Sequence, residues 1–153
     1  MSIVEYLDIK QVLTGVPSRS KKQVIEELAE RVSTLTGLSQ RSLLDLVMRR
    51  ERLGSTGIGG GIAIPHAVHD DLTNTTVLLA VLETPVDFDA IDGQPVDIIC
   101  LVIGPPNDET NNLKCIASVA RSLQQKSTCD ELRSVRSPEA VLQCLQAFGS
   151  VAA

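Results

Sequence analysis

Apolar residues recur at helical spacing in the first third of the chain. Ser20 precedes one such run as a candidate N-cap, and Gly37 follows it as a candidate terminator. A second amphipathic run opens at Ser39 and closes at Gly54. Each pair of residues therefore bounds a predicted helix. The apolar positions of the first helix are Val24, Leu28, Val32 and Leu35.

The middle of the chain changes to the pattern of buried strands. Segments 75–82 and 96–103 are nearly continuous in β-branched and aliphatic residues. Such runs are typical of strands covered on both faces. A shorter strand is predicted at 62–64, and Asp92-Gly93 marks a turn before the last strand.

Helical spacing returns after the last strand. Ser137-Pro138 is a helix-start signal, because proline suits the first helical position, and Gly149 is predicted to end that helix. Helices, then doubly buried strands, then helices predict an α/β fold of one domain, with a sheet covered by helices on both faces. Another helix is predicted between the last strand and Ser137. Its apolar stripe consists of Leu113, Ile116, Ala117, Ala120 and Leu123.

Composition narrows the possible functions. The 153 residues are 43% hydrophobic and 22% charged, as in a globular protein with a proper core. Aromatic side chains, which stack on single-stranded nucleic acid, make up only 2% of the chain, and a net charge of −5 repels phosphate backbones. No nucleic-acid partner is expected. Segment 1–10 lacks a signal pattern and no apolar run is long enough to span a bilayer, so a cytoplasmic, not membrane-embedded, protein is expected.

Segment 49–67, RRERLGSTGIGGGIAIPHA, contains the residues suited to phosphate chemistry. Arg50 and Arg52 offer fixed positive charge in a fork geometry. The hydroxyls of Ser55 and Thr56 and the amides of 57–61 can add hydrogen bonds.

His66 is the candidate nucleophile of this segment. It follows a predicted strand and Pro65, whose fixed φ can hold the loop that presents the imidazole. One ring nitrogen of a neutral imidazole can attack a phosphoryl donor, while the other donates to a carbonyl or carboxylate that sets the tautomer. Phosphoryl transfer requires mainly positioning and charge neutralisation, so a site of few residues is chemically adequate.

Other chemistries fit the sequence less well. The glycine-rich stretch 57–61 follows a helix and leads into a strand, the reverse of a dinucleotide loop, so no cofactor is expected. His66 and His69 form an H-x-x-H, but a metal site needs at least one more ligand, and only Asp70 and Asp71, with no cysteine, are near in the sequence. No metal is therefore expected, and His69 is predicted to be exposed on a loop. No G-x-S-x-G elbow supports a hydrolase. The cysteines are predicted to be buried or half-buried thiols: Cys100, Cys115, Cys129 and Cys144.

Segment 49–67 resembles the mannitol/fructose-type EIIA domain of the bacterial phosphotransferase system, and most of all its nitrogen-type EIIA regulatory branch. The resemblance extends over nearly the whole chain. It includes VDFDAIDGQPVDIICLVIGPP at 86–106, NNLKCIASVARSL at 111–123 and LRSVRSPEAVLQCL at 132–145.

The resemblance implies a single EIIA type-2 domain over residues 1–153, with a mixed β-sheet sandwiched between helices. It implies that His66 is the phosphorylated residue, that Arg50 lies beside it, and that Ser55 and Thr56 line the phosphate pocket. The donor would be an HPr-like phosphocarrier charged by an Enzyme I-type kinase. The protein would act as a carrier rather than as a turnover enzyme on a small molecule.

Two residues depart from the family pattern. Many relatives have a second histidine where this chain has Asn112. An amide at this place in the pocket can hydrogen-bond but cannot share a proton. Ala67 stands where glycine is usual, which we interpret as a minor change.

Three roles are compatible with this resemblance. A nitrogen-type protein would signal through phosphorylation-dependent binding to targets such as potassium-transport or metabolic regulators. A sugar-specific EIIA would pass the phosphoryl group to an EIIB domain, although the length of the chain favours regulation. A third possibility is a binding module that is never phosphorylated, which the Asn112 departure keeps open.

Overall fold

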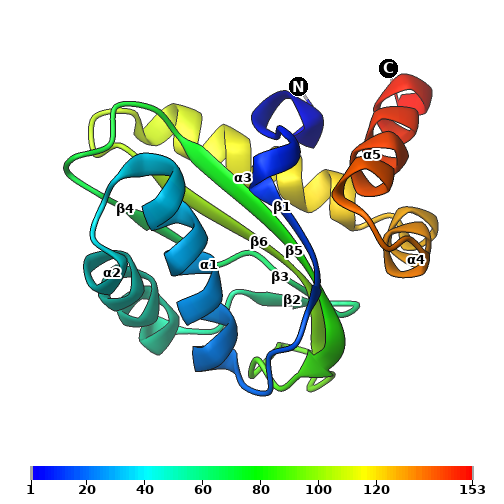
Figure 1. The fold of residues 1–153 in the computed structure, drawn as a ribbon, viewed down its shortest axis with the longest axis horizontal. Coiled ribbons are helices and arrows are strands. Elements are labelled where there is room, and N and C mark those ends of the chain that lie inside the picture. The colour runs from blue at the N-terminus through cyan, green and yellow to red at the C-terminus, as the bar shows by residue number, and fades with distance from the viewer. Residues whose placement is uncertain (1, 153) are drawn as a thin grey trace.

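A six-stranded mixed sheet forms the centre of the fold within residues 2–152, the part of the chain that this computed structural model describes, with side chains up to residue 147 (Figure 1). β6 is antiparallel to β5, and β1 is parallel to β5. β3 and β4 are both parallel to β6, and β2 pairs with β3. The strands are β1 (Val12–Val16), β2 (Gly57–Gly59), β3 (Ile62–Ala63), β4 (His66–Val68), β5 (Thr76–Val86) and β6 (Val96–Gly104).

Helices cover both faces of the sheet, as the sequence predicts (Figure 1). One face packs against α1 (Lys21–Thr36) and α2 (Gln40–Leu53). The other packs against η1, α3, α4 and α5. Neighbouring residues of one strand enter different cores, since Leu78 faces the α1–α2 side and Leu79 faces the other. These elements are η1 (Ile3–Tyr6), α3 (Glu109–Leu123), α4 (Lys126–Ser134) and α5 (Pro138–Ala152), and η2 (Ile9–Gln11) directly precedes β1.

Local signals set the ends of the first two helices. The Ser20 hydroxyl accepts a hydrogen bond from the Gln23 amide, and Gly37 ends α1 in the left-handed region at φ 80°. Ser39 caps α2, and Gly54 follows its last residue. The predicted limits of both helices are confirmed.

Two predictions for the later helices differ from the structure. The predicted stripe of α3 is right in part, because Leu123 is buried and Ile116 and Ala120 pack against the core, whereas Leu113 and Ala117 are exposed. The centre of the buried face is displaced toward Cys115 and Val119, and buried serines between them interrupt the apolar pattern. α5 continues past Gly149 to Ala152, because a glycine inside a helix costs only about 1 kcal/mol.

The pairing along β6 places His66 at one end of the sheet. β3 pairs with the first half of β6, and β4 pairs with the second half, where His66 lies opposite Val102. The interruption falls at Pro65, whose carbonyl still accepts from the Val102 amide. α2 packs against β4, and α3 begins soon after β6 ends. His66 therefore lies between α2 and α3.

No helix in the described residues has both the length and the apolar character required to cross a membrane.

Candidate functional site

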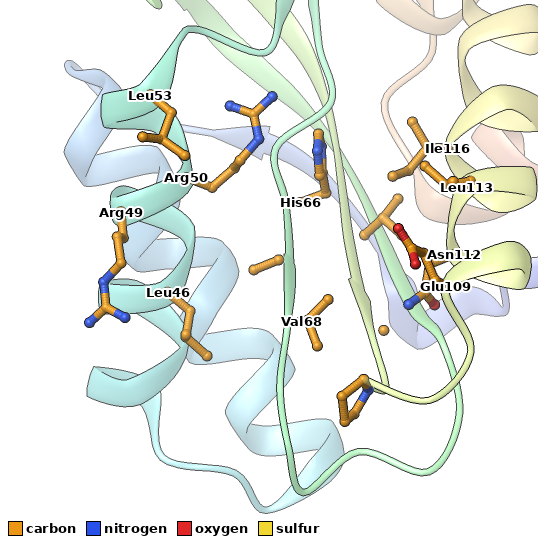
Figure 2. A pocket seen from close by; sticks show the side chains of 14 residues that line it. Leu46, Arg49, Arg50, Leu53, His66, Val68, Glu109, Asn112, Leu113 and Ile116 are labelled. Atoms are coloured by element: carbon orange, nitrogen blue, oxygen red, sulfur yellow. The ribbon is translucent and has the colours of Figure 1, made fainter.

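An open cavity of about 450 Å³ lies between α2, β4 and the start of α3 (Figure 2). His66 is at its centre, with Arg50 on the α2 side and Asn112 on the α3 side. The cavity thus brings together three of the five residues that the sequence predicts for the site. Its other lining residues are Leu46, Arg49, Leu53, Ala67, Val68, Val102, Gly104, Pro106, Glu109, Leu113 and Ile116.

The His66 imidazole is held in one tautomer. Its Nδ1 lies 2.9 Å from the carbonyl oxygen of Ile64. A carbonyl can only accept, so Nδ1 carries the hydrogen, and in the neutral ring it is Nε2 that has the free lone pair. The ring is half-buried and lines the cavity, so a reacting group can approach it from outside. The geometry matches the expectation that one ring nitrogen is fixed by a carbonyl while the other is available.

Arg50 supplies fixed positive charge beside the imidazole. One of its Nη atoms donates to the Gly54 carbonyl at 2.9 Å, just past the end of α2. A guanidinium has five N–H donors, so others remain for a phosphoryl oxygen.

Arg49 and Glu109 also line the cavity. Arg49 precedes Arg50 on α2, where a positive charge near the C-terminal end suits the helix dipole. Glu109 is in the first turn of α3 and carries no motif signal. Both residues reach the cavity because α2 and α3 pack on either side of β4. This packing is a long-range feature, so the local sequence does not predict that they line the cavity.

Asn112 is buried and both ends of its amide are bonded. Oδ1 accepts from the Thr75 hydroxyl at 2.7 Å, and Nδ2 donates to the Pro105 carbonyl at 3.0 Å. Asn111 in turn donates to the Thr75 oxygen at 3.1 Å. This network fixes the amide orientation. It leaves the second N–H of Nδ2 as a neutral donor for a bound oxygen.

Ser55 and Thr56 differ from the expectation that they line the pocket. The Ser55 hydroxyl donates to the Phe88 carbonyl at 2.6 Å, and the Thr56 hydroxyl donates to the buried Glu51 carboxylate. Residues 57–61 form β2 and its turn into β3, and they do not line the cavity. These groups therefore do not cradle the imidazole.

His69 is buried, contrary to the prediction of an exposed loop residue. Its Nδ1 accepts from the Asp71 amide at 3.1 Å, so Nε2 carries the hydrogen and faces the Ser42 hydroxyl at 3.3 Å. The Ser42 contact comes from α2, which covers the loop. Among the described residues, no group of three metal-binding side chains occurs around His69 or elsewhere.

The rim of the cavity is apolar and accessible. Leu53 is 84% exposed, Leu113 is 59% exposed and Val68 is 46% exposed. Large exposed apolar side chains that surround a pocket mark a protein-docking surface. The His66 cavity therefore has an exposed apolar rim.

Comparison with known proteins identifies the family of the chain. The family model described as "Phosphoenolpyruvate-dependent sugar phosphotransferase system, EIIA 2" matches residues 5–148. The chain is 35% identical to the nitrogen regulatory protein of Bradyrhizobium diazoefficiens over 145 residues, which is 95% of each chain. It is 36% identical to that of Escherichia coli K12 over 131 residues, 85% of this chain and 80% of the relative.

Solved structures of EIIA proteins share the fold of this chain. The crystal structure of nitrogen regulatory protein IIA-Ntr from Neisseria meningitidis superposes with a TM-score of 0.88 at 34% identity, covering 94% of this chain and 98% of that one. The mannitol IIA of Escherichia coli shares the fold at a TM-score of 0.77 and 21% identity, covering 91% of this chain and 98% of its own. The chain therefore belongs to the EIIA 2 family of the phosphoenolpyruvate-dependent sugar phosphotransferase system, and nitrogen regulatory proteins are among its relatives.

Proposed function

We propose that this protein is a nitrogen-type EIIA phosphocarrier that accepts a phosphoryl group on Nε2 of His66 from an HPr-like carrier in the cytoplasm. The observation that supports this proposal is the Nδ1 contact with the Ile64 carbonyl, which leaves Nε2 as the nucleophile in a cavity shared with Arg50. Identities of 35% and 36% to nitrogen regulatory proteins favour this branch over the sugar-specific one, whose fructose relatives are 25% and 29% identical.

The transfer requires one bond to form and one to break. The Nε2 lone pair of His66 attacks the phosphorus of the donor, and the bond from phosphorus to the donor imidazole breaks with its electron pair returning to that ring. The Nδ1 proton stays on His66, where the Ile64 carbonyl stabilises the positive charge that develops on the ring. Arg50 neutralises charge on the transferred oxygens, and Asn112 adds a neutral donor.

Phosphorylation would convert the cavity into a signal. The phosphoryl group adds almost two negative charges and three acceptor oxygens to a pocket with an apolar rim. A partner that buries Leu53 and Leu113 would then have to desolvate that charge. Binding of target proteins, such as potassium-transport or metabolic regulators, would therefore depend on the state of His66.

The direct test is phosphorylation by a reconstituted system. The protein is incubated with phosphoenolpyruvate, an Enzyme I-type kinase and an HPr-like carrier, and its intact mass is followed. We expect an acid-labile gain of one phosphoryl group that His66→Ala abolishes. His69→Ala is the matched control, because it removes the other imidazole of the chain and should still be labelled.

Two other outcomes of this experiment correspond to the alternatives. Rapid onward transfer of the label to a sugar-specific EIIB domain would favour a role in carbohydrate uptake. A folded wild-type protein that takes no label would indicate a binding module and overturn the proposal.

A further inference from the structure

A buried carboxylate lies directly behind the cationic residue of the site. Arg50 and Glu51 are consecutive on the last turn of α2, and their side chains leave the helix about 100° apart. Arg50 lines the cavity, whereas the Glu51 side chain is 2% exposed and points into the fold. A buried carboxylate is costly unless it is paired and hydrogen-bonded, so the partners of Glu51 indicate what it does.

Thr56 supplies most of those partners. Its amide donates to Glu51 Oε2 at 3.0 Å and its hydroxyl donates to Oε1. Lys21 completes the set, with Nζ 3.3 Å from Oε2 and 4.8 Å from the centre of the Phe88 ring. Charge-assisted hydrogen bonds of this kind are about twice as strong as neutral ones. Glu51 and Thr56 therefore fix the turn that follows α2.

The turn after α2 is hydrogen-bonded, directly or through Ile64, to both Arg50 and His66. The Gly54 carbonyl, two residues before Thr56, accepts from Arg50 at 2.9 Å. The Thr56 carbonyl accepts from the Ile64 amide at 3.0 Å, and the Ile64 carbonyl accepts from His66 Nδ1 at 2.9 Å. One hydrogen-bonded segment thus anchors the guanidinium at one end and the imidazole at the other.

We propose that Glu51 and Thr56 are positioning residues that set Arg50 against His66 during phosphoryl transfer. This inference rests on the proposed function. Neither side chain lines the cavity, so neither touches the phosphoryl group. They act by fixing the Gly54 carbonyl and the Ile64 amide, which restricts an otherwise flexible arginine to one orientation. The two residues that react with or neutralise the phosphoryl group are then held in place by a hydroxyl and a carboxylate outside the cavity.

The test removes one hydroxyl and preserves shape. Thr56→Val keeps the volume of the side chain and loses the donor to Glu51, whereas Thr56→Ser keeps the donor. For Thr56→Val we expect the maximal rate of His66 phosphorylation to fall roughly tenfold, with the half-saturating concentration of donor carrier nearly unchanged. Thr56→Ser should restore most of the rate. Thr128→Val is the matched control, since Thr128 is equally buried but lies in α4.

A double-mutant cycle separates positioning from general loosening of the fold. If Thr56 acts by setting Arg50 against His66, Thr56→Val should cost less than about twofold in an Arg50→Ala background. An equal loss in both backgrounds, or a full rate in Thr56→Val alone, would overturn the inference.

A measurement without phosphorylation keeps this inference distinct from the proposed function. The guanidinium N–H proton signals of Arg50, assigned by their loss in Arg50→Ala, should be resolved in the wild type and Thr56→Ser and averaged in Thr56→Val. Unlabelled wild-type protein with these signals intact would overturn the proposed function but leave the orientation of Arg50 established. Identical signals in all three proteins would overturn the positioning role.

Discussion

The amide of Asn112 packs so closely against Gly104 that a Cβ at position 104 would overlap all three heavy atoms of that amide. Gly104 is the last residue of β6, and Asn112 is in the first turns of α3. The absence of a side chain at one position therefore allows the other to reach the Pro105 carbonyl and Thr75. This contact sets how closely α3 approaches the cavity.

Gly104→Ala should displace Asn112 and reshape the cavity. We expect a loss of about 1–3 kcal/mol in the free energy of unfolding, as for other overpacked sites, measured by urea denaturation. The rate of His66 phosphorylation should fall as well, because a lining residue moves. In an Asn112→Ala background the same substitution should cost much less, since the overlapping atoms are gone. Equal costs in both backgrounds would contradict the contact.

His69→Ala should lower stability without preventing phosphorylation. The buried ring accepts from the Asp71 amide and faces the Ser42 hydroxyl, so its removal takes away both hydrogen bonds and opens a small cavity. We expect a loss of about 1–3 kcal/mol in urea denaturation. His69→Asn, which can keep an acceptor near the Asp71 amide, should recover part of that loss. If His69→Ala blocked labelling of His66, the separation of the two histidines into different roles would be wrong.

The sequence predicts those features that depend on local chemistry. Ser20 and Gly37 bound α1 because capping and the left-handed turn involve residues three or four positions apart. The long strands β5 and β6 are predicted because both of their faces are buried. A strand of this kind has a nearly unbroken apolar sequence, which is visible without the structure. Motif 49–67 likewise places Arg50 and His66 in one region.

Features that depend on distant contacts are not predicted. β4 is three residues long and exists because it pairs with β6, far along the chain. The buried His69 ring meets Ser42 of α2, a contact that no pattern around His69 reveals. Thr56 has the composition of a phosphate ligand, yet the buried Glu51 takes its hydroxyl. A residue type limits which bonds are possible, while the packed fold decides which of them form.

Leu113→Glu should weaken docking of the donor carrier while leaving the fold intact. Leu113 is 59% exposed, so its replacement costs little stability, but it would place a charge on the apolar rim of the His66 cavity. We expect the half-saturating concentration of carrier to rise roughly tenfold, because one buried apolar anchor is worth more than 1 kcal/mol. Ile91→Glu is the matched control, since Ile91 is 85% exposed and lies outside the cavity. Equal effects of the two variants would exclude this rim as the docking surface.

The cysteines should make the fold sensitive to alkaline pH. Burial raises the pKa of the Cys115 thiol from its ordinary value of 9.0 to about 11, and it raises the pKa of Cys100 and Cys129 as well. Between these two values the unfolded chain has lost the proton that the folded chain keeps, so the unfolded state binds fewer protons and stability falls as pH rises. The contribution of the Cys115 thiol to stability is complete below about pH 9 and is lost as pH passes about 11.

Urea denaturation over this interval should therefore show a falling free energy of unfolding, with a shallower slope against pH in Cys115→Ala than in the wild type. Cys144 is half-buried, and Cys144→Ala should change the slope less. An unchanged slope in Cys115→Ala would show that its thiolate is not excluded from the folded core.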